Sequence, residues 1–422
     1  MMCNKFGILL FVFIAFTTSL FSQERIKVMS YNLLNFNNYT SYCTTQNNPH
    51  QAKAGYLATI VANQQPDILC CCEVGKSSSL ANTIYYILGN SLNVNGVRRW
   101  SAASASGNEY LNNALFYDNT KLKLVAQTKV NTDIREINIY KLKHLYSNDT
   151  LKVAIVHLKA GTGYESQRGT EIQQLVNYLT AQGNNDNFIV CGDFNIYKAS
   201  EPAFQNLVNP SYLPIAFYDP VNQMGEWNND WNFSEYHTQS THSGSGNDCF
   251  SGGGMDDRFD FILMSGSIIN GTKGITYSQN SYWAVGQDGN RFNGAINSPT
   301  NNTLPSNVID ALYNMSDHLP VVADLIFNNA VGYASESTDA SFQSIVQNPA
   351  NDELVVRLRT EKPREVTVNV YSALGRLVLS YSVQVANDEV VARNISDLPN
   401  GVYIVSIKSE GVSVSHRVVK AE

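Results

Sequence analysis

The chain has 422 residues, a net charge of -7, 43% hydrophobic residues and 15% charged residues. This length exceeds one ordinary domain and predicts two folded units, each able to bury a core. The composition excludes a disordered or fibrous protein. No basic run is longer than a pair such as Arg98-Arg99, which argues against a protein that binds nucleic acid by charge alone.

The N-terminal segment, residues 1–22, has the layout of a secretory signal peptide. Lys5 precedes an apolar run from Phe6 to Phe16, and small and polar residues follow as far as Ser22, an order typical of export signals. The run is shorter than the about 20 apolar residues that cross a bilayer. We therefore expect no transmembrane segment in the mature chain, with a buried N-terminal helix as the alternative interpretation.

Six cysteines would remain after removal of this signal. Residues 70–72 and Cys191 lie in apolar, strand-like runs, where a free cysteine behaves as a small core residue. Cys43 and Cys249 lie in expected loops and are the disulfide candidates, because export permits such bonds. A cysteine-based metal site is disfavoured, since the chain lacks two separated Cys-x-x-Cys pairs.

Residues 23–327 are predicted to form an α/β catalytic domain. The spacing of Ile172, Leu175, Val176 and Leu179 indicates an amphipathic helix that ends at Gly183. A second helix is expected before Pro66. Strands are expected at 26–31, 68–72, 151–156, 188–191, 258–264 and 319–326.

The C-terminal part has a different pattern. Residues 328–342 have little apolar character and indicate a linker. In residues 343–422, apolar and polar residues alternate with period two between turns such as Pro399-Asn400-Gly401, which predicts a small all-β sandwich domain.

Polar residues that could carry chemistry follow the apolar runs of the first domain. Asn32 and Glu73 end the first two strands, and His157 ends a later one. An isolated carboxylate such as Glu73 is costly unless it is paired, and a hard cation such as Mg²⁺ would pair with it. A turn-forming Asn and a structural His are the alternatives for Asn32 and His157.

Two further strand ends carry acids. Asp193 and Asn195 follow the run 189–191 and lie on the same face by period two; a carboxylate that orients water and an amide that binds phosphate suit hydrolysis at phosphorus. Asp260 lies between two phenylalanines, so it needs a buried partner, and His318 is the natural one. Asp317 would then face a metal ion.

This ordered set of residues resembles the endonuclease/exonuclease/phosphatase superfamily, which includes deoxyribonucleases, repair exonucleases, sphingomyelinases and inositol polyphosphate phosphatases. The resemblance covers about residues 25–327. It rests on Ser30-Tyr31-Asn32, Glu73, Ala114-Leu115-Phe116-Tyr117, His157-Leu158, Gly192-Asp193-Phe194-Asn195, Arg258-Phe259-Asp260-Phe261 and Ser316-Asp317-His318-Leu319-Pro320. One departure is Cys72, where the family has Gln before its metal-binding Glu.

The resemblance implies a four-layer α/β sandwich, two packed sheets flanked by helices, and an Mg²⁺- or Mn²⁺-dependent phosphoester hydrolase; Ca²⁺ is a further candidate as a structural ion. It gives metal roles to Asn32, Glu73 and Asp317. It implies that Asp193 orients water, Asn195 contacts phosphate, and His318, held by Asp260, protonates or binds a phosphoryl oxygen. His157 would assist the leaving group.

Nucleic acid, DNA or also RNA, is the expected substrate. The long loop from Trp227 to Asp256 could contact it, because aromatic rings stack on bases and hydroxyls reach phosphate. The candidate substrate-binding residues are Tyr117, Thr238, Ser240 and Thr241. A lipid or inositol phosphate phosphodiesterase, or a surface-binding protein without activity, is the alternative.

The tail resembles the C-terminal sorting domain of the Bacteroidetes type IX secretion system. The resemblance rests on Asn348-Pro349-Ala350, Val370-Tyr371-Ser372-Ala373-Leu374-Gly375-Arg376 and Leu398-Pro399-Asn400-Gly401-Val402-Tyr403. It implies that type IX secretion machinery is a partner and that the protein is secreted or held on the outer cell surface. An ordinary β-sandwich binding module is the alternative.

Overall fold

The computed structural model describes residues 24–76, 79–107, 110–145, 147–183, 186–209, 215–244, 249–327, 342–373, 375–409 and 412–421. The expected signal peptide, 1–22, and all but the last residue of the expected linker, 328–342, lie outside these residues. The described residues belong to two compact units, 24–327 and 342–421. Each unit has a hydrophobic core of its own.

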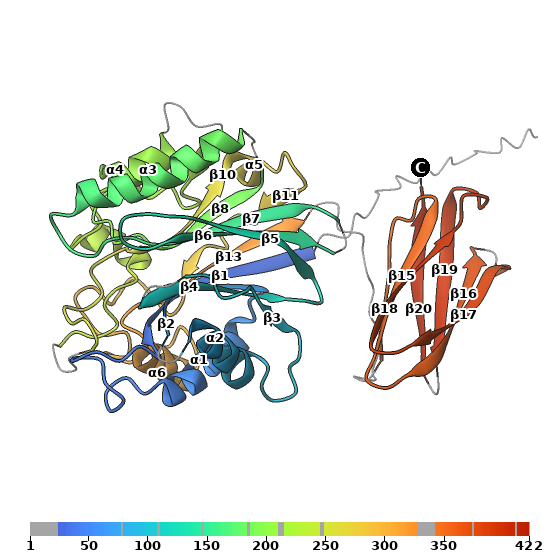
Figure 1. Cartoon of the computed structure of the whole chain (residues 1–422), viewed down its shortest axis with the longest axis horizontal. Helices are drawn as coiled ribbons and strands as arrows, with labels where there is room; N and C mark the ends of the chain where they lie inside the picture. The colour runs from blue at the N-terminus through green and yellow to red at the C-terminus, as the bar shows by residue number, and fades with distance from the viewer. Residues whose placement is uncertain are drawn as a thin grey trace, which may run out of the picture. The chain divides into compact units, whose positions relative to one another are not determined.

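Two mixed β-sheets pack face to face in the first unit (Figure 1). The seven-stranded sheet has the order β11-β13-β1-β2-β4-β3, with β12 paired to β13, and the six-stranded sheet has the order β5-β6-β7-β8-β10-β9. The strands are β1 (Glu24–Phe36), β2 (Ile68–Gly75), β3 (Trp100–Ala102), β4 (Leu111–Asp118), β5 (Leu122–Val130), β6 (Ile137–His144), β7 (Thr150–His157), β8 (Phe188–Asp193), β9 (Phe217–Tyr218), β10 (Asp260–Ser265), β11 (Ile275–Tyr277), β12 (Trp283–Ala284) and β13 (Val321–Phe327).

Helices cover the outer face of each sheet. In Figure 1, α3 and α4 lie over the six-stranded sheet, and α1, α2 and α6 lie on the far side of the seven-stranded sheet. This order of helix, sheet, sheet and helix confirms the expected four-layer α/β sandwich. The helical segments are α1 (His50–Gln64), α2 (Leu80–Ile87), η1 (Leu88–Leu92), α3 (Glu165–Gln182), α4 (Pro202–Val208), η2 (Trp231–Tyr236), α5 (Gly266–Ile269) and α6 (Ser306–Met315).

The strands in the middle of the sheets are apolar on both faces because both faces are covered. In β2, Ile68 and Cys70 pack between the two sheets, whereas Leu69 and Cys71 pack under the helices. The four cysteines in such strands, residues 70–72 and 191, are buried and free, which confirms that they serve as core residues. Gly183, with φ of 61°, caps α3 in the left-handed region, as expected.

The second unit is built from β-strands alone within its described residues. A three-stranded sheet, β14-β15-β18, and a four-stranded sheet, β17-β16-β19-β20, share one apolar core, which confirms the expected all-β sandwich. The strands are β14 (Phe342–Val346), β15 (Glu353–Thr360), β16 (Arg364–Ser372), β17 (Leu377–Val385), β18 (Asp388–Asn394), β19 (Gly401–Ser409) and β20 (Val412–Lys420).

A disulfide joins Cys43 and Cys249, as expected, across 206 residues of sequence. The bond packs with Leu34 and Phe250 in a small separate apolar cluster. It therefore ties the loop after β1 to the loop that carries Phe250. None of the helices in the described part of the chain combines the length and apolar character needed to cross a membrane.

Replacing both Cys43 and Cys249 by Ser should lower the free energy of unfolding of the first unit by about 2–5 kcal/mol, because the bond restricts a long loop of the unfolded chain. Urea unfolding of wild type and variant, each with and without reductant, measures this loss. Reductant should weaken only the wild type. An equal effect of reductant on the double variant would contradict this account of the bond.

Candidate active site

The topology brings the polar strand ends to one edge of the sandwich. Strands β1 and β2 run parallel, as do β7 and β8, so their carboxyl ends meet at the same edge of each sheet. Strand β10 is antiparallel to β8 and starts there, with Asp260 directly opposite Asp193. Strand β13 is antiparallel to β1 and begins just after Asp317 and His318. Sequence-distant side chains thus converge on one site.

Glu73 is turned into the site by a distortion of β2. The register with β4 shifts between Cys71 and Val74, and Glu73 itself has a φ of 59°. A non-glycine residue in this left-handed region costs about 1–3 kcal/mol and persists only where its surroundings hold it. The backbone N–H of Asn35 holds it by donating to Glu73 Oε2 at 2.8 Å.

Asn32 links two of the carboxylates. Its amide Nδ2 donates to Glu73 Oε1 and to Asp193 Oδ2, each at 3.1 Å, while its Oδ1 accepts from the backbone of Leu34 at 2.9 Å. In this orientation the oxygen of Asn32 does not face the carboxylates. Asn32 therefore positions Glu73 and Asp193, and direct binding of a metal by Asn32 would require its amide to turn.

A buried lysine holds the backbone that follows Asn32. Lys53 Nζ donates to the carbonyls of Leu33 and Leu34 at 2.8 and 2.5 Å and to Asn48 Oδ1 at 2.8 Å. Burial lowers the pKa of Lys53 to about 7, although Glu73 and Asp317 oppose the shift. The sequence analysis missed Lys53, because one lysine on a helix carries no signal of burial.

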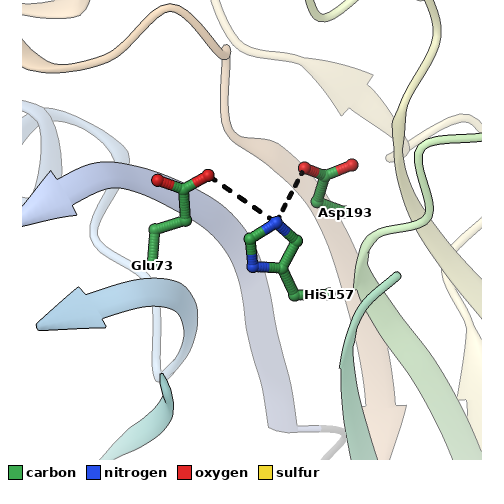
Figure 2. Close-up of side chains that lie close together, drawn as sticks. All are labelled: Glu73, His157 and Asp193. Atoms are coloured by element: carbon green, nitrogen blue, oxygen red, sulfur yellow. Dashed lines mark ion pairs between the residues drawn. The ribbon is translucent and has the colours of Figure 1, made fainter. Parts of the chain in front are cut away.

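Glu73, His157 and Asp193 form a cluster that could hold a metal ion (Figure 2). His157 Nε2 lies 3.6 Å from Glu73 Oε1 and 3.7 Å from Asp193 Oδ2, and one ligand atom from each residue lies within 4.8 Å of the other two. These separations are too long for direct hydrogen bonds. Three ligand atoms therefore converge on a common point without bonding to one another.

The electrostatics of the cluster fit a cation. Burial, helped by Asp260 and Glu73 and opposed by His318, raises the pKa of Asp193 to about 7. Burial also lowers the pKa of His157 well below its usual value, with Arg135 and His318 adding to the shift. A neutral imidazole, the buried carboxylate of Asp193 and the partly exposed carboxylate of Glu73 form a donor set for a divalent ion, and the ion would offset the cost of burying Asp193.

His318 and Asp260 form the expected pair. Asp260 Oδ2 lies 2.7 Å from His318 Nδ1, and both side chains are buried. Burial opposes the charge on His318, but the carboxylates of Asp260 and Asp193 outweigh it, so its pKa lies well above the usual value. Asp193 Oδ2 lies 3.8 Å from His318 Nε2. The site thus contains an imidazole that is oriented from behind by an acid, and the charge of that acid favours the protonated form of the ring.

Asp317 lies beside this pair and outside the three-residue cluster. Its Oδ2 accepts from the backbone of Ser251 at 3.0 Å and from Gln239 Nε2 at 3.4 Å, and its buried Oδ1 has no hydrogen-bond partner in the described structure. The Gln239 Nε2 atom also lies 2.7 Å from His318 Nε2; an amide nitrogen there donates to a neutral imidazole, and a protonated Nε2 would require the Gln239 amide to turn its oxygen toward it. The sequence analysis missed Gln239, since a single amide in a long loop has no distinguishing pattern.

Hydrogen bonds to the backbone carbonyls of His157 and Leu158 fix the end of β7 and the position of Asn195. Arg135 Nη1 donates to the carbonyls of His157 and Leu158, each at 3.1 Å, and Asn195 Nδ2 donates to the Leu158 carbonyl at 3.2 Å. This bond uses one of the two hydrogens of the Asn195 amide, and the second could reach a phosphate oxygen. Arg135 gave no signal in the sequence, because it is a lone cation in a loop.

The four residues expected to bind substrate lie elsewhere or are occupied by other contacts. Tyr117 pairs with Ile68 at the opposite end of β2 from Glu73. The three hydroxyls are buried and hydrogen-bonded within the protein. Thr238 accepts from the backbone of Asp260 at 3.2 Å, Ser240 donates to Ser251 O at 2.5 Å and Thr241 donates to Ser316 O at 2.7 Å. These hydroxyls hold the loop against the site.

Comparison with known proteins agrees with this geometry. Residues 29–318 match the model of the Endonuclease/Exonuclease/phosphatase family. The chain belongs to this family. Family members are phosphoester hydrolases, and a site of converging acids and imidazoles suits that chemistry. Residues 345–421 match the secretion system C-terminal sorting domain, which indicates export and attachment at the cell surface.

Individual relatives are distant. Nocturnin of Xenopus laevis is 25% identical over 276 residues, which span 63% of this chain and 61% of that protein. The solved catalytic domain of human Nocturnin, with a bound sulfate anion, is 18% identical, with a TM-score of 0.47 over 71% of this chain and 94% of that one. TDP2 of D. rerio, solved with a single-strand DNA product, is 13% identical, with a TM-score of 0.47 over 71% and 98%.

Replacing Asp193 by Asn should change how metal-free stability depends on pH. The folded-state pKa of about 7 exceeds the unfolded value of about 3.9, so the folded state binds this proton more tightly. Stability of the wild type therefore falls as pH rises from about 4 to 7. Urea unfolding in EDTA measures the free energy of unfolding of both proteins. Between pH 4 and 8, the stability of the variant relative to the wild type should increase by about 2 kcal/mol or more.

The test reads how the stability difference changes with pH, not its absolute size. The new amide also faces the Asn32 and Asn195 donors, which changes stability by the same amount at every pH. Asp310→Asn, on the exposed side of α6, is the matched control and should parallel the wild type. A stability difference for Asp193→Asn that stays constant with pH would refute the raised pKa.

Proposed function

We propose that the protein is a secreted, divalent-metal-dependent phosphodiesterase that acts as a nuclease on DNA, with RNA as a further candidate substrate. The observation that carries this proposal is the His318–Asp260 pair, in which His318 Nε2 lies 3.8 Å from Asp193 Oδ2 of the Glu73, His157 and Asp193 cluster. A proton donor and a cation site at this separation can act on the same phosphate group.

Glu73, Asp193 and His157 would hold the ion, with Asp317 beside them as the further ligand implied by the family resemblance. Mg²⁺ or Mn²⁺ would take the carboxylates, which suit both ions, and Mg²⁺ would keep several of its waters. When bound, the ion supplies positive charge that neutralises the phosphate and stabilises charge that develops during hydrolysis.

The chain's own residues would supply the remaining chemistry. His318, kept charged and oriented by Asp260, would donate from Nε2 to a phosphoryl oxygen. Asp193 Oδ2 lies between His157 and His318, at 3.7 and 3.8 Å, where it could orient a water molecule for attack in line with the leaving oxygen. Asn32 would hold both Glu73 and Asp193 in place during the reaction.

Exposed aromatic residues near the site support nucleic acid as the substrate. Tyr110 is 78% exposed, directly precedes the Leu111–Gly75 pair beside Glu73, and has Lys76 Nζ 5.9 Å from its ring centre. Tyr164, in the loop after His157, is 44% exposed and lies under Lys159 Nζ at 4.0 Å. Such rings can stack on bases while the ammonium groups meet phosphates.

The substrate is tested by incubating purified protein with plasmid DNA, RNA and sphingomyelin in Mg²⁺, Mn²⁺ or EDTA. Cleavage of DNA that EDTA abolishes and added metal restores is the expected result. Cleavage of sphingomyelin alone would favour the lipid alternative, for which Trp231, 64% exposed, would be a candidate contact. Activity that survives EDTA would refute the metal requirement, and inactivity on every substrate would favour a binding protein.

His318→Ala should lower kcat on DNA by about 10²–10⁴-fold, because a positioned proton donor contributes rate enhancements of that size. His50→Ala is the matched control: His50 starts α1 and contacts Tyr39, outside the proposed machinery, and it should retain activity. Thermal unfolding of both variants checks the fold. Full activity of a folded His318→Ala protein would show that the site assignment is wrong.

A further inference from the structure

Gln239 pairs with two backbone segments, one on either side of it. It forms an isolated antiparallel bridge with His318 and another with Asp257. Residues directly opposite each other in antiparallel strands project their side chains to the same face, with Cβ atoms about 5 Å apart. Asp257, Gln239 and His318 therefore form a row, and the Asp257 side chain lies on the face of the site that His318 occupies.

The carboxylate of Asp257 has one oxygen without an internal role. Its Oδ1 accepts from Asn228 Nδ2 at 2.8 Å, and its backbone carbonyl accepts from Thr238 and Gln239 at 2.7 and 3.1 Å. Within the described part of the chain, Oδ2 has no hydrogen-bond partner and no cation pairs with the group. Burial, opposed by the Asn228 bond, raises the pKa of Asp257 to about 7.

Two aromatic rings, those of Phe259 and Tyr197, follow His318 along this side of the site. The Phe259 ring lies 6.4 Å from the His318 ring, and the Tyr197 ring meets Phe259 edge to face at 5.1 Å. The backbone of Tyr197 accepts from the backbone of Asn228 at 3.2 Å. Burial and then the charge of Asp257 raise the pKa of Tyr197.

A carboxylate in this position suits only part of a phosphodiester substrate. It repels a second phosphate, but its free oxygen can accept a hydrogen bond from a hydroxyl or an amino group, and the Tyr197 ring offers an apolar face beside it. Donor groups of this kind occur on the sugar and base of a nucleoside. A simple aryl phosphate ester lacks them.

We propose that Asp257 is a specificity-determining residue whose Oδ2 accepts a hydrogen bond from a hydroxyl or amino group of the nucleoside next to the scissile phosphate. Asn228 orients the carboxylate and Tyr197 lies alongside the bound nucleoside. This inference rests on the proposed phosphodiesterase function and identifies the part of the substrate that the enzyme selects.

The test compares two chromogenic diesters that differ in donor groups. Bis(p-nitrophenyl) phosphate has none, whereas thymidine 5′-(p-nitrophenyl phosphate) has a sugar hydroxyl and a base N–H. In Asp257→Asn, the new amide oxygen would stay with the Asn228 donor and the new NH₂ would meet the substrate donor. KM for the thymidine ester should rise about 10-fold or more, with kcat little changed and both constants unchanged for the other ester.

Asp256→Asn is the matched control, because it removes the same charge at the adjacent position, which projects to the opposite face. It should leave the ratio of kcat/KM for the two esters unchanged. Equal losses on both esters in Asp257→Asn, or no loss on either, would overturn the inference while leaving the phosphodiesterase function standing. A metal-loaded wild type that cleaves neither ester would overturn both.

Discussion

Buried negative charge at one edge of the sandwich is the constraint on which the rest of the structure depends. Glu73, Asp193, Asp260 and Asp317 converge there from four strand ends, and three of the four are almost fully buried. Carboxylates held close together away from water repel one another, and burial with the charges of Asp260 and Glu73 raises the pKa of Asp193 to about 7. The groups around these acids offset their negative charge.

Each neighbour offsets a part of that charge in a different way. His318 pairs with Asp260, and the nearby carboxylates raise its pKa well above the usual value. Asn32 gives both of its amide hydrogens to Glu73 and Asp193. Lys53, whose pKa burial lowers to about 7, donates to the backbone behind the site. His157 stays neutral. A divalent ion among the remaining oxygens would complete the compensation, so metal affinity and fold stability should be thermodynamically linked.

Much of the fold and most of the converging residues could be predicted from the sequence, because their signals are local. An apolar run that ends in Glu73, Asp193 or His157 indicates both a buried strand and a polar end. The family pattern then places these ends at one edge. Period-two alternation likewise predicted the second unit, and the loop positions of Cys43 and Cys249 pointed to the observed disulfide.

The remaining features depend on three-dimensional packing and have no local signal. Thr238 and its neighbours look like surface hydroxyls in a polar loop. The loop instead folds against β10 and the residues before β13, and the hydroxyls form hydrogen bonds within the protein. Lys53 looks like a solvated helix residue, and only the positions of the Leu33 and Leu34 carbonyls make it internal. Tyr117 belongs to a recognisable strand, but strand direction places it at the far end from Glu73.

The disulfide seen among the described residues also favours a particular order of events during folding. Four other cysteines, residues 70–72 and 191, are reactive competitors in an unfolded chain, and three of them acquire raised thiol pKa values once buried, which suppresses their thiolate forms. Burial of those thiols in the sheets would therefore favour selective pairing of Cys43 with Cys249, 206 positions apart. The disulfide would then form late, after the sheets that carry the site have folded, and earlier oxidation would produce mispaired chains.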